Sequence, residues 1–270
     1  MAHPNPYLVE MLAATEEVAA IALGGSRAGG VNDDASDYDL YVLTTGRIDP
    51  AIREHIVREV ADTAPYEIAI PWWGDEDALA IDGRRYELAY FDVGWFSDGI
   101  DAVVSHHRAS QGYTTSFINT VAKMQPLHDP AALISGWKER IAVYPEALVT
   151  AIIATNYPVS CTIQASYRNQ IARAIDLGDA VAVNHRVAAF LACVFDIAFA
   201  VLRMWHPGEK RQLQYLQRHA DALPIGFAEH ITAILHHTAP DRLGDLLAAV
   251  DMVVSDVDYL VEPLGQAPFT

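Results

Sequence analysis

Strand-forming and helix-forming patterns separate along this chain of 270 residues. Residues 18–23 and 37–44 are short runs rich in strand-forming side chains, and residues 78–91 hold Asp82-Gly83 between two further runs, the pair most typical of a hairpin turn. From about residue 146 onward the sequence is almost entirely helix-compatible, and its Pro and Gly breakers have the spacing of helix connections. The sequence therefore predicts an α+β fold, in which a mixed β-sheet with flanking helices precedes a C-terminal helical bundle.

The same patterns predict where the elements and domains lie. We expect one more strand over residues 66–70, and beyond about residue 95 the strand signals stop. We place a boundary after residue 145, which gives one domain over residues 1–145 and an all-helical domain over residues 146–270. Helices are expected over residues 6–17, 49–64, 97–109, 115–124, 130–142, 160–177, 180–205, 209–222, 225–237 and 240–261.

Charge and cysteine content argue against several classes of protein. Asp and Glu total 35 against 18 Lys and Arg, a net charge of −17, and this argues against an extended nucleic-acid interface because neutralising phosphates takes clustered basic residues. The two cysteines exclude a disulfide framework and a Cys-rich zinc site, so a reducing cytoplasm is the simplest compartment. The N-terminus lacks the basic start of a signal peptide, and no uninterrupted apolar stretch approaches about 18 residues. We expect a cytoplasmic protein with no membrane or nucleic-acid partner.

The segment from Gly24 to Asp39 carries the pattern most indicative of chemistry. A predicted strand ends in Gly24-Gly25-Ser26, and the next begins with Asp37 and Asp39, whose side chains project from the same face because strand residues alternate. Two carboxylates this close repel each other unless a cation lies between them, and Mg²⁺ takes such oxygen ligands together with phosphates. The glycine turn offers backbone N–H groups and the Ser26 hydroxyl to a phosphate. The sequence therefore predicts a metal and phosphate site here.

Gly25-Ser26 followed by Asp37-Tyr38-Asp39 resembles the signature of the DNA polymerase β-like nucleotidyltransferase superfamily, which is Gly-Ser and then Asp-x-Asp. Within it, the chain is similar to the small bacterial aminoglycoside and lincosamide nucleotidyltransferases and to DUF4037-type proteins, which have a helical C-terminal half. The resemblance implies an enzyme that uses Mg²⁺, with two ions expected. It would move a nucleoside monophosphate from a nucleoside triphosphate, with ATP favoured, to a hydroxyl of a small-molecule acceptor and release pyrophosphate. Antibiotic-like compounds are among the candidate acceptors.

The resemblance also implies a third carboxylate on a neighbouring strand, for which Glu87 and Asp92 are the candidates. On a regular strand residues 87, 89 and 91 share one face and Asp92 lies on the other. Asp92 falls at the end of the strand, whereas Glu87 lies mid-strand between apolar neighbours, so we expect Glu87; a β-bulge would reverse the choice. Asp37, Asp39 and Glu87 are thus the predicted catalytic and metal-binding residues. Glu87, a metal-bound hydroxide and a carboxylate of the helical half stay open as the base that deprotonates the acceptor.

For the nucleotide, the resemblance assigns Gly25 and Ser26 to the phosphates. Arg27 is a further candidate phosphate contact, and pairing with Asp33 or Asp34 is the alternative.

A cation from the helical half is also expected at the triphosphate. Pro207-Gly208 breaks the preceding helix, so Lys210 and Arg211 are predicted to fall in the first turn of the next one. Cations in that turn oppose the helix dipole, an unfavourable placement for stability alone, whereas a lysine at a helix N-terminus suits an anion. We therefore predict that Lys210 contacts phosphate.

Two other functions stay open at this point. One is nucleotide transfer to a macromolecule, either a protein side chain, as in toxin–antitoxin nucleotidyltransferases, or a tRNA end, which the net charge disfavours. The other is a non-catalytic nucleotide sensor that keeps the glycine loop. The sequence is also compatible with a homodimer.

Overall fold

The computed structural model describes residues 3–28, 37–62, 65–71 and 74–265. The chain divides into two units. The first, the sheet unit, comprises Met1–Asp101 and Thr120–Val143, and the second, the helical unit, comprises Ala102–Asn119 and Tyr144–Thr270. No sequence pattern predicted that residues 102–119 would group with the helical unit. The later crossing, between residues 143 and 144, lies beside the boundary expected after residue 145.

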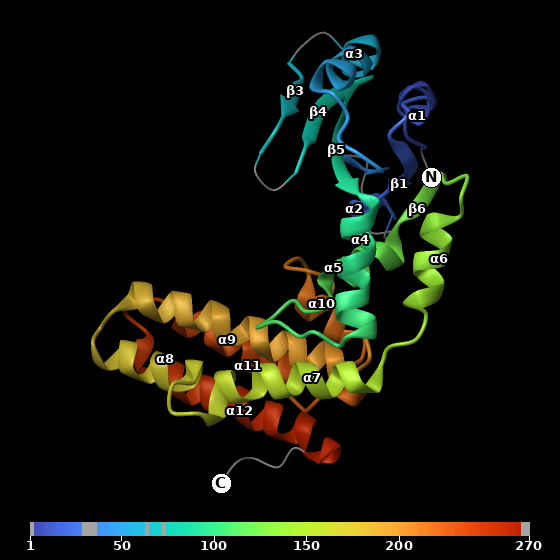
Figure 1. The fold of residues 1–270 in the computed structure, drawn as a ribbon. Helices are drawn as coiled ribbons and strands as arrows, with labels where there is room; N and C mark the ends of the chain where they lie inside the picture. The colour runs from blue at the N-terminus through green and yellow to red at the C-terminus, as the bar shows by residue number, and fades with distance from the viewer. Residues whose placement is uncertain (1–2, 29–36, 63–64, 72–73, 266–270) are drawn as a thin grey trace. The chain divides into compact units, whose positions relative to one another are not determined.

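Six strands of the described residues form one sheet, in the order β3-β4-β5-β2-β1-β6. β2 and β5 are parallel and the other neighbours are antiparallel, so the sheet is mixed, as predicted. The strands are β1 (Val18–Leu23), β2 (Tyr38–Thr44), β3 (Glu67–Ala69), β4 (Glu76–Ile81), β5 (Arg84–Asp92) and β6 (Gln125–His128) (Figure 1).

The turn between β4 and β5 is the hairpin that Asp82-Gly83 predicted. Both residues have positive φ angles, 52° and 70°, as a tight two-residue hairpin turn requires. The carboxylate of Asp62 accepts hydrogen bonds from the backbone N–H groups of both, at 3.0 and 2.8 Å. The turn chemistry therefore fixes the β4–β5 register, which in turn decides which β5 side chains share a face with β4.

β6 is a strand that the sequence analysis did not predict. It is only four residues long and contains Pro126, which cannot donate a backbone hydrogen bond. It lies at the edge of the sheet, antiparallel to β1, where a proline is tolerated because one side of the strand has no partner.

Helices α1 and α3 cover one face of the sheet. These two helices lie side by side and bury their apolar sides with strand residues such as Leu40 and Leu88 (Figure 1). Alternate strand residues, among them Asp39 and Glu87, project from the opposite face, which we call the pocket face. The bounds are α1 (Pro6–Ala13), α2 (Gly25–Ala28), α3 (Pro50–Val60), α4 (Val93–Ile100), α5 (Ser116–Lys123, which crosses between the units) and α6 (Leu133–Arg140).

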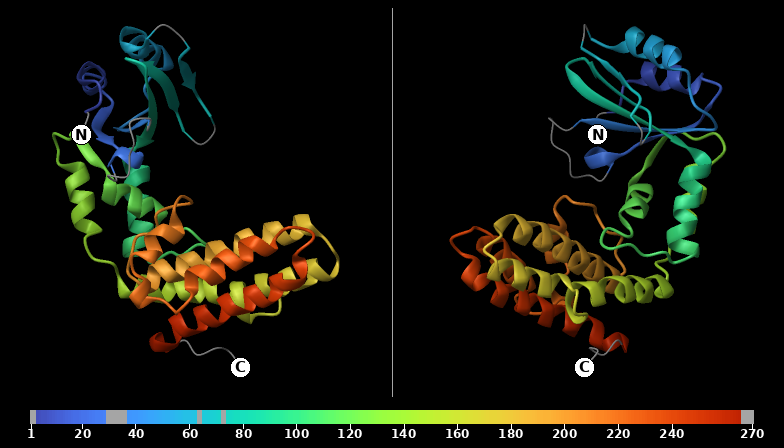
Figure 2. Two further views of the ribbon diagram at one scale, coloured as in Figure 1. Left: turned by 180° about the vertical axis from the view of Figure 1, so that it is seen from behind. Right: turned by 60° about the vertical axis from the view of Figure 1, so that its left-hand side comes forward.

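The helical unit is built around α9, which packs against α7, α8 and α12 (Figure 2). The α-helices are α7 (Glu146–Tyr157), α8 (Tyr167–Asp176), α9 (Ala180–Val201), α10 (Gln212–Gln217), α11 (Phe227–His237) and α12 (Leu246–Val261). Five short turns complete the described helical structure: η1 (Asp101–Ser105) and η2 (Pro158–Thr162) are π-helical, and η3 (Ala220–Ala222), η4 (Leu243–Asp245) and η5 (Glu262–Leu264) are 3₁₀. The C-terminal half is thus helical, and the predicted fold class is confirmed.

α9 is also, among the described helices, the one long and apolar enough by length and composition to cross a membrane. Phe190, Val194 and Ile197 of this helix are buried in the core of the helical unit. A helix that forms the centre of a helical core is apolar on most sides for that reason alone.

A buried polar network holds the segment 102–119 within the helical unit. The Asp196 carboxylate on α9 accepts hydrogen bonds from the Thr114 backbone N–H at 3.0 Å, the Thr114 hydroxyl at 2.7 Å and the Asn156 side-chain amide at 3.2 Å. Burial nevertheless raises the pKa of Asp196 to about 7, because desolvation outweighs the hydrogen bonds from Thr114 and Asn156. The contacts join residues far apart in sequence, so no local pattern could have revealed them.

Candidate active site

Asp39 and Glu87 lie side by side on the pocket face of the sheet. β2 and β5 pair in parallel without a register shift, and Asp39 is opposite Glu87. Neighbouring strands are about 4.8 Å apart, so the two carboxylates stand on adjacent strands of one surface. The same row continues through Ala78 on β4 to Glu67 on β3. The unbroken pairing shows that Glu87 and Asp39 share a face, which alternation within β5 alone could not have shown.

Asp92, the alternative third carboxylate, has a structural role instead. It ends β5 opposite Thr44, and its Oδ1 accepts a hydrogen bond from the Trp95 backbone N–H at 2.8 Å. This contact makes Asp92 the N-cap of α4. The cap also explains why this helix begins at Val93, earlier than the expected start at residue 97.

Arg85 links two of the predicted carboxylates. Its Nη2 lies 2.7 Å from Glu87 Oε1, and its Nε lies 3.9 Å from Asp37 Oδ2. Asp37 immediately precedes β2, and Arg85 precedes Glu87 by two residues, so these three charged side chains lie on the same face as Asp39. Arg85 was not among the site residues predicted from the sequence. Its spacing of two residues from Glu87 was the available signal, because that spacing places both on one side of a strand.

The glycine turn after β1 makes room for β2 side chains. Gly25 has φ +58°, and a Cβ added there would overlap the Asp39 carboxylate; a Cβ on Gly24 would overlap the Tyr41 ring. The Gly24 backbone N–H donates to the Asp39 carbonyl at 2.8 Å, which ties the turn to β2. Both glycines are therefore required by close approach of β2, and Gly25 is required by its φ angle as well.

A cavity of about 400 Å³ opens on the pocket face. Asp39 and Glu87 line it together with Arg85, and Glu67 and Glu76 stand on its β3 and β4 side. The remaining lining residues are Leu40, Tyr41, Ala69, Asp77, Ala78, Leu88, Ala89 and Phe91. A largely acidic cavity with small alanine side chains on its strands suits a cation, or an anion that arrives with its own metal.

Tyr41 and Asp77 differ in what they can contribute to this cavity. Burial, and then the Asp39 carboxylate, raise the pKa of Tyr41 to about 12, so its hydroxyl stays protonated at neutral pH and cannot act as a base there.

Asp77 alternates to the core side of β4, where it contacts Tyr90 at 2.7 Å and Arg53 at 3.1 Å. Burial raises the pKa of Asp77 to about 6 despite these two partners. Asp77 thus anchors α3 and β5 beneath the cavity.

Three of the predicted nucleotide contacts, Gly25, Ser26 and Arg27, lie in α2. The side chain of Ser26 lies outside what the structure describes. Arg27 is buried, its Nε donates to the Asp37 carbonyl at 3.1 Å, and its guanidinium carbon lies 4.2 Å from the centre of the Tyr38 ring. These contacts fix the start of β2, and a phosphate contact of Arg27 stays a prediction.

The prediction that Lys210 and Arg211 fall in the first turn of a helix was wrong. Arg211 has φ +60°, a left-handed conformation that cannot continue an α-helix, and α10 begins only at Gln212. Lys210 is therefore an exposed residue of the preceding bend in the helical unit. α10 has six residues, so the expected anion site at a helix N-terminus has no support. A contact between Lys210 and phosphate stays a prediction that rests on the side-chain charge alone.

The predicted metal ligands do not form a ready-made metal site. In the part of the chain that the structure describes, no three His, Cys, Asp or Glu side chains are grouped so that they could hold a metal ion. Asp37 and Glu87 are instead bridged by Arg85, while Asp39 and Glu87 keep adjacent positions on β2 and β5. Binding of a metal by all three carboxylates therefore stays a prediction that requires Arg85 to move.

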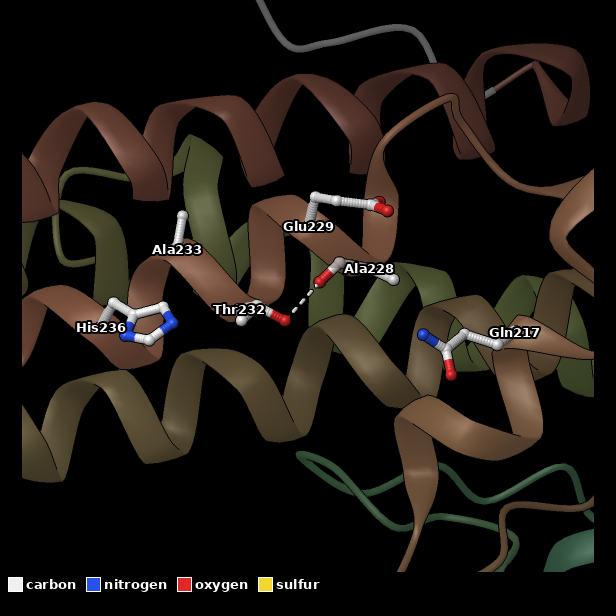
Figure 3. Close-up of a pocket in the computed structure, with 6 residues that line it drawn as sticks. All are labelled: Gln217, Ala228, Glu229, Thr232, Ala233 and His236. Carbon is white, nitrogen blue, oxygen red and sulfur yellow. Dashed lines mark hydrogen bonds between the residues drawn. The ribbon is translucent and has the colours of Figure 1, made fainter.

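Another hollow, of about 280 Å³, lies beside α11 in the helical unit (Figure 3). Its lining residues are Gln217, Ala228, Glu229, Thr232, Ala233 and His236. The Thr232 hydroxyl donates to the Ala228 carbonyl at 2.8 Å, so it is engaged within its own helix. None of the predicted site residues lines this hollow, and we place the candidate active site on the pocket face of the sheet.

Comparisons with known proteins give two similarities. A family described as a domain of unknown function (DUF4037) matches residues 113–211, which confirms the resemblance to DUF4037-type proteins for that segment. A solved structure of a nucleotidyltransferase-like protein from Exiguobacterium sibiricum 255-15 is similar at 10% sequence identity and a TM-score of 0.47, over 95% of this chain and 75% of that one. No curated protein matches the chain.

Proposed function

We propose that the chain is a metal-dependent nucleotidyltransferase that moves a nucleoside monophosphate from a nucleoside triphosphate to a hydroxyl of a small-molecule acceptor. The observation that carries this proposal is the pair Asp39 and Glu87, in register on β2 and β5, lining a cavity beside the glycine turn. The pair was predicted from a resemblance to nucleotidyltransferases. Its placement on one face supports the reaction class, because phosphoryl transfer depends mainly on positioning and on neutralising charge.

The residues fit a magnesium ion of the kind that arrives with a nucleotide. Mg²⁺ usually binds one or two carboxylates and takes its other oxygens from substrate phosphates and water. Asp39 and Glu87 supply two carboxylates that line an open cavity, and Asp37 is the third candidate. Glu87 and Asp37 become available to the metal once Arg85 releases them. When bound, the metal would neutralise phosphate charge and lower the pKa of the attacking hydroxyl.

The chain's own groups have separate tasks in this proposal. Asp39 is held against Gly25, where the missing Cβ allows the carboxylate and the turn to approach each other. Backbone N–H groups of the turn are the proposed phosphate donors, as predicted from the sequence. Glu87 faces the cavity and is the proposed acceptor of the proton from the attacking hydroxyl.

The same cavity favours a positively charged acceptor. Glu67 and Glu76 line it on β3 and β4, beyond the Asp39–Glu87 pair. Carboxylates attract amino groups and repel phosphates that carry no metal, so an amine-bearing alcohol suits this side better than an anionic one. This supports an aminoglycoside-like acceptor over a tRNA end.

The proposal is tested by pyrophosphate release. The wild-type protein is incubated with Mg²⁺, each nucleoside triphosphate and a panel of amine-bearing and neutral alcohols. We expect release that needs both nucleotide and acceptor, is greatest with amine-bearing alcohols, and is lost in Asp39→Asn and Glu87→Gln. Nucleotide binding without pyrophosphate release on any acceptor would favour the nucleotide sensor instead.

A further inference from the structure

Four charged side chains stand together at the start of β5 and the entry to β2. Arg85 and Glu87 are neighbours on one face of β5, Asp39 is the register partner of Glu87, and Asp37 immediately precedes β2. Arg85 contacts Glu87 at 2.7 Å and Asp37 at 3.9 Å. Among the described residues that line the cavity, Arg85 is the only basic one. The guanidinium of Arg85 thus faces carboxylates proposed to hold metal.

Stability does not account for this arrangement. The side chains of Arg85, Glu87 and Asp37 are 62%, 45% and 41% exposed, and ion pairs between such exposed groups contribute little to folding. The same ion pairs do, however, affect how strongly the carboxylates bind a metal ion. A guanidinium in contact with a carboxylate repels a second cation at the same oxygens, and the effect is larger for a divalent ion than for a monovalent one.

We propose that Arg85 is a built-in counter-ion that competes with divalent metal for Asp37 and Glu87, so that the site binds metal weakly until a nucleoside triphosphate binds with it. This inference rests on the proposed function. In the nucleotide-free protein Arg85 neutralises two carboxylates that would otherwise repel each other. When a metal–nucleotide complex binds, Arg85 gives up those carboxylates, and its planar guanidinium donates bidentate hydrogen bonds to phosphate oxygens of the triphosphate.

The inference is tested by metal binding without any turnover. Free Mn²⁺ is measured by electron paramagnetic resonance in titrations of the wild type, Arg85→Gln and Arg58→Gln. Arg58 is a matched control because it is 63% exposed and pairs with Glu54 at 2.6 Å on α3, which covers the other face of the sheet. We expect Arg85→Gln to bind Mn²⁺ roughly tenfold more tightly than the wild type at low ionic strength, and Arg58→Gln to be unchanged.

A second variant and a nucleotide arm complete the test. Arg85→Lys keeps the charge and should bind Mn²⁺ as weakly as the wild type. A non-hydrolysable nucleoside triphosphate should tighten Mn²⁺ binding in the wild type, and this gain should be smaller in Arg85→Gln. Equal Mn²⁺ affinities of Arg85→Gln and the wild type, or weaker binding by Arg85→Gln, would overturn the inference.

Failure of this inference can be told apart from failure of the proposed function. Asp39→Asn should lose Mn²⁺ binding in the presence of the non-hydrolysable nucleotide. If it binds like the wild type, the metal–nucleotide site is misplaced and the role of Arg85 fails with it. If Asp39→Asn loses binding while Arg85→Gln titrates like the wild type, the site stands and Arg85 does not compete for it.

Discussion

Replacing Gly25 by alanine tests the close approach of the glycine turn to Asp39. Gly25 has φ +58°, where alanine costs roughly 1–2 kcal/mol, and the added Cβ would overlap the Asp39 carboxylate. Forcing that side chain from its rotamer costs about 1 kcal/mol more. We therefore expect Gly25→Ala to lower the free energy of unfolding of the sheet unit by about 2–3 kcal/mol. Because Asp39 must leave its position, Mn²⁺–nucleotide affinity should fall at least about tenfold, equivalent to 1.4 kcal/mol.

Gly83→Ala is the matched control for this prediction. Gly83 has φ +70° in the β4–β5 turn, and no atom within 4 Å would meet an added Cβ. It therefore carries the same backbone cost, about 1–2 kcal/mol, without a displaced side chain. Both variants are compared by urea denaturation and by Mn²⁺–nucleotide titration. The reasoning is refuted if Gly25→Ala destabilises no more than Gly83→Ala and binds Mn²⁺–nucleotide like the wild type.

Three further predictions follow from other parts of the structure. Asp92→Ala should lower the free energy of unfolding, measured in urea, by about 1 kcal/mol, because α4 loses its N-cap. The variant should release pyrophosphate like the wild type. If the folded variant loses this activity, Asp92 becomes the candidate third carboxylate again. Lys210→Ala should raise the KM for nucleotide more than the KM for acceptor, and equal effects would indicate a structural role. The pKa of Asp196 is raised from 3.8 to about 7 in the folded protein, so the folded state binds this proton more tightly than the unfolded state does. The stability that protonated Asp196 contributes is therefore complete below about pH 4 and is lost as the pH rises through 7. Thermal melts should therefore show a decline across this range that is smaller in Asp196→Asn, with the remainder due to other buried acids such as Asp77. An unchanged decline in that variant would contradict the assignment.

Local sequence patterns were sufficient for the elements that build the site. The apolar run over residues 18–23 and the alternating run before Thr44 became β1 and β2, because buried central strands show their character in composition alone. Asp82-Gly83 identified the hairpin through the φ angles that it tolerates. Alternation along β5 separated Glu87 from Asp92, and the register with β2 then showed that Glu87 shares a face with Asp39.

Features that depend on distant partners could not be predicted in the same way. β6 contains Pro126 and forms a strand only because the edge of β1 is available to it. Residues 102–119 group with the helical unit, where Thr114 meets Asp196, 82 positions away in sequence. Arg211 adopts a positive φ angle that its residue type does not favour, which moved the start of α10 and corrected the predicted placement of Lys210.

The ion pairs of the candidate site depend partly on local sequence pattern and partly on distant pairing. Alternation places Arg85 and Glu87 on one face, so their contact was accessible to sequence reasoning. The additional contact with Asp37 depends on the parallel pairing of β2 with β5, which brings the beginning of one strand beside the beginning of the other. Pairing order is a property of the whole sheet, and composition does not specify it.

The measurement that tests the central claim most directly follows the label of a nucleoside triphosphate. The wild-type protein, Mg²⁺ and an amine-bearing alcohol are incubated with nucleotide labelled at either the α- or the γ-phosphate. The account predicts that α-label appears on the acceptor, that γ-label appears only in pyrophosphate, and that Asp39→Asn abolishes both while keeping the fold. Transfer of γ-label to the acceptor, or transfer of α-label that survives in Asp39→Asn, would contradict it.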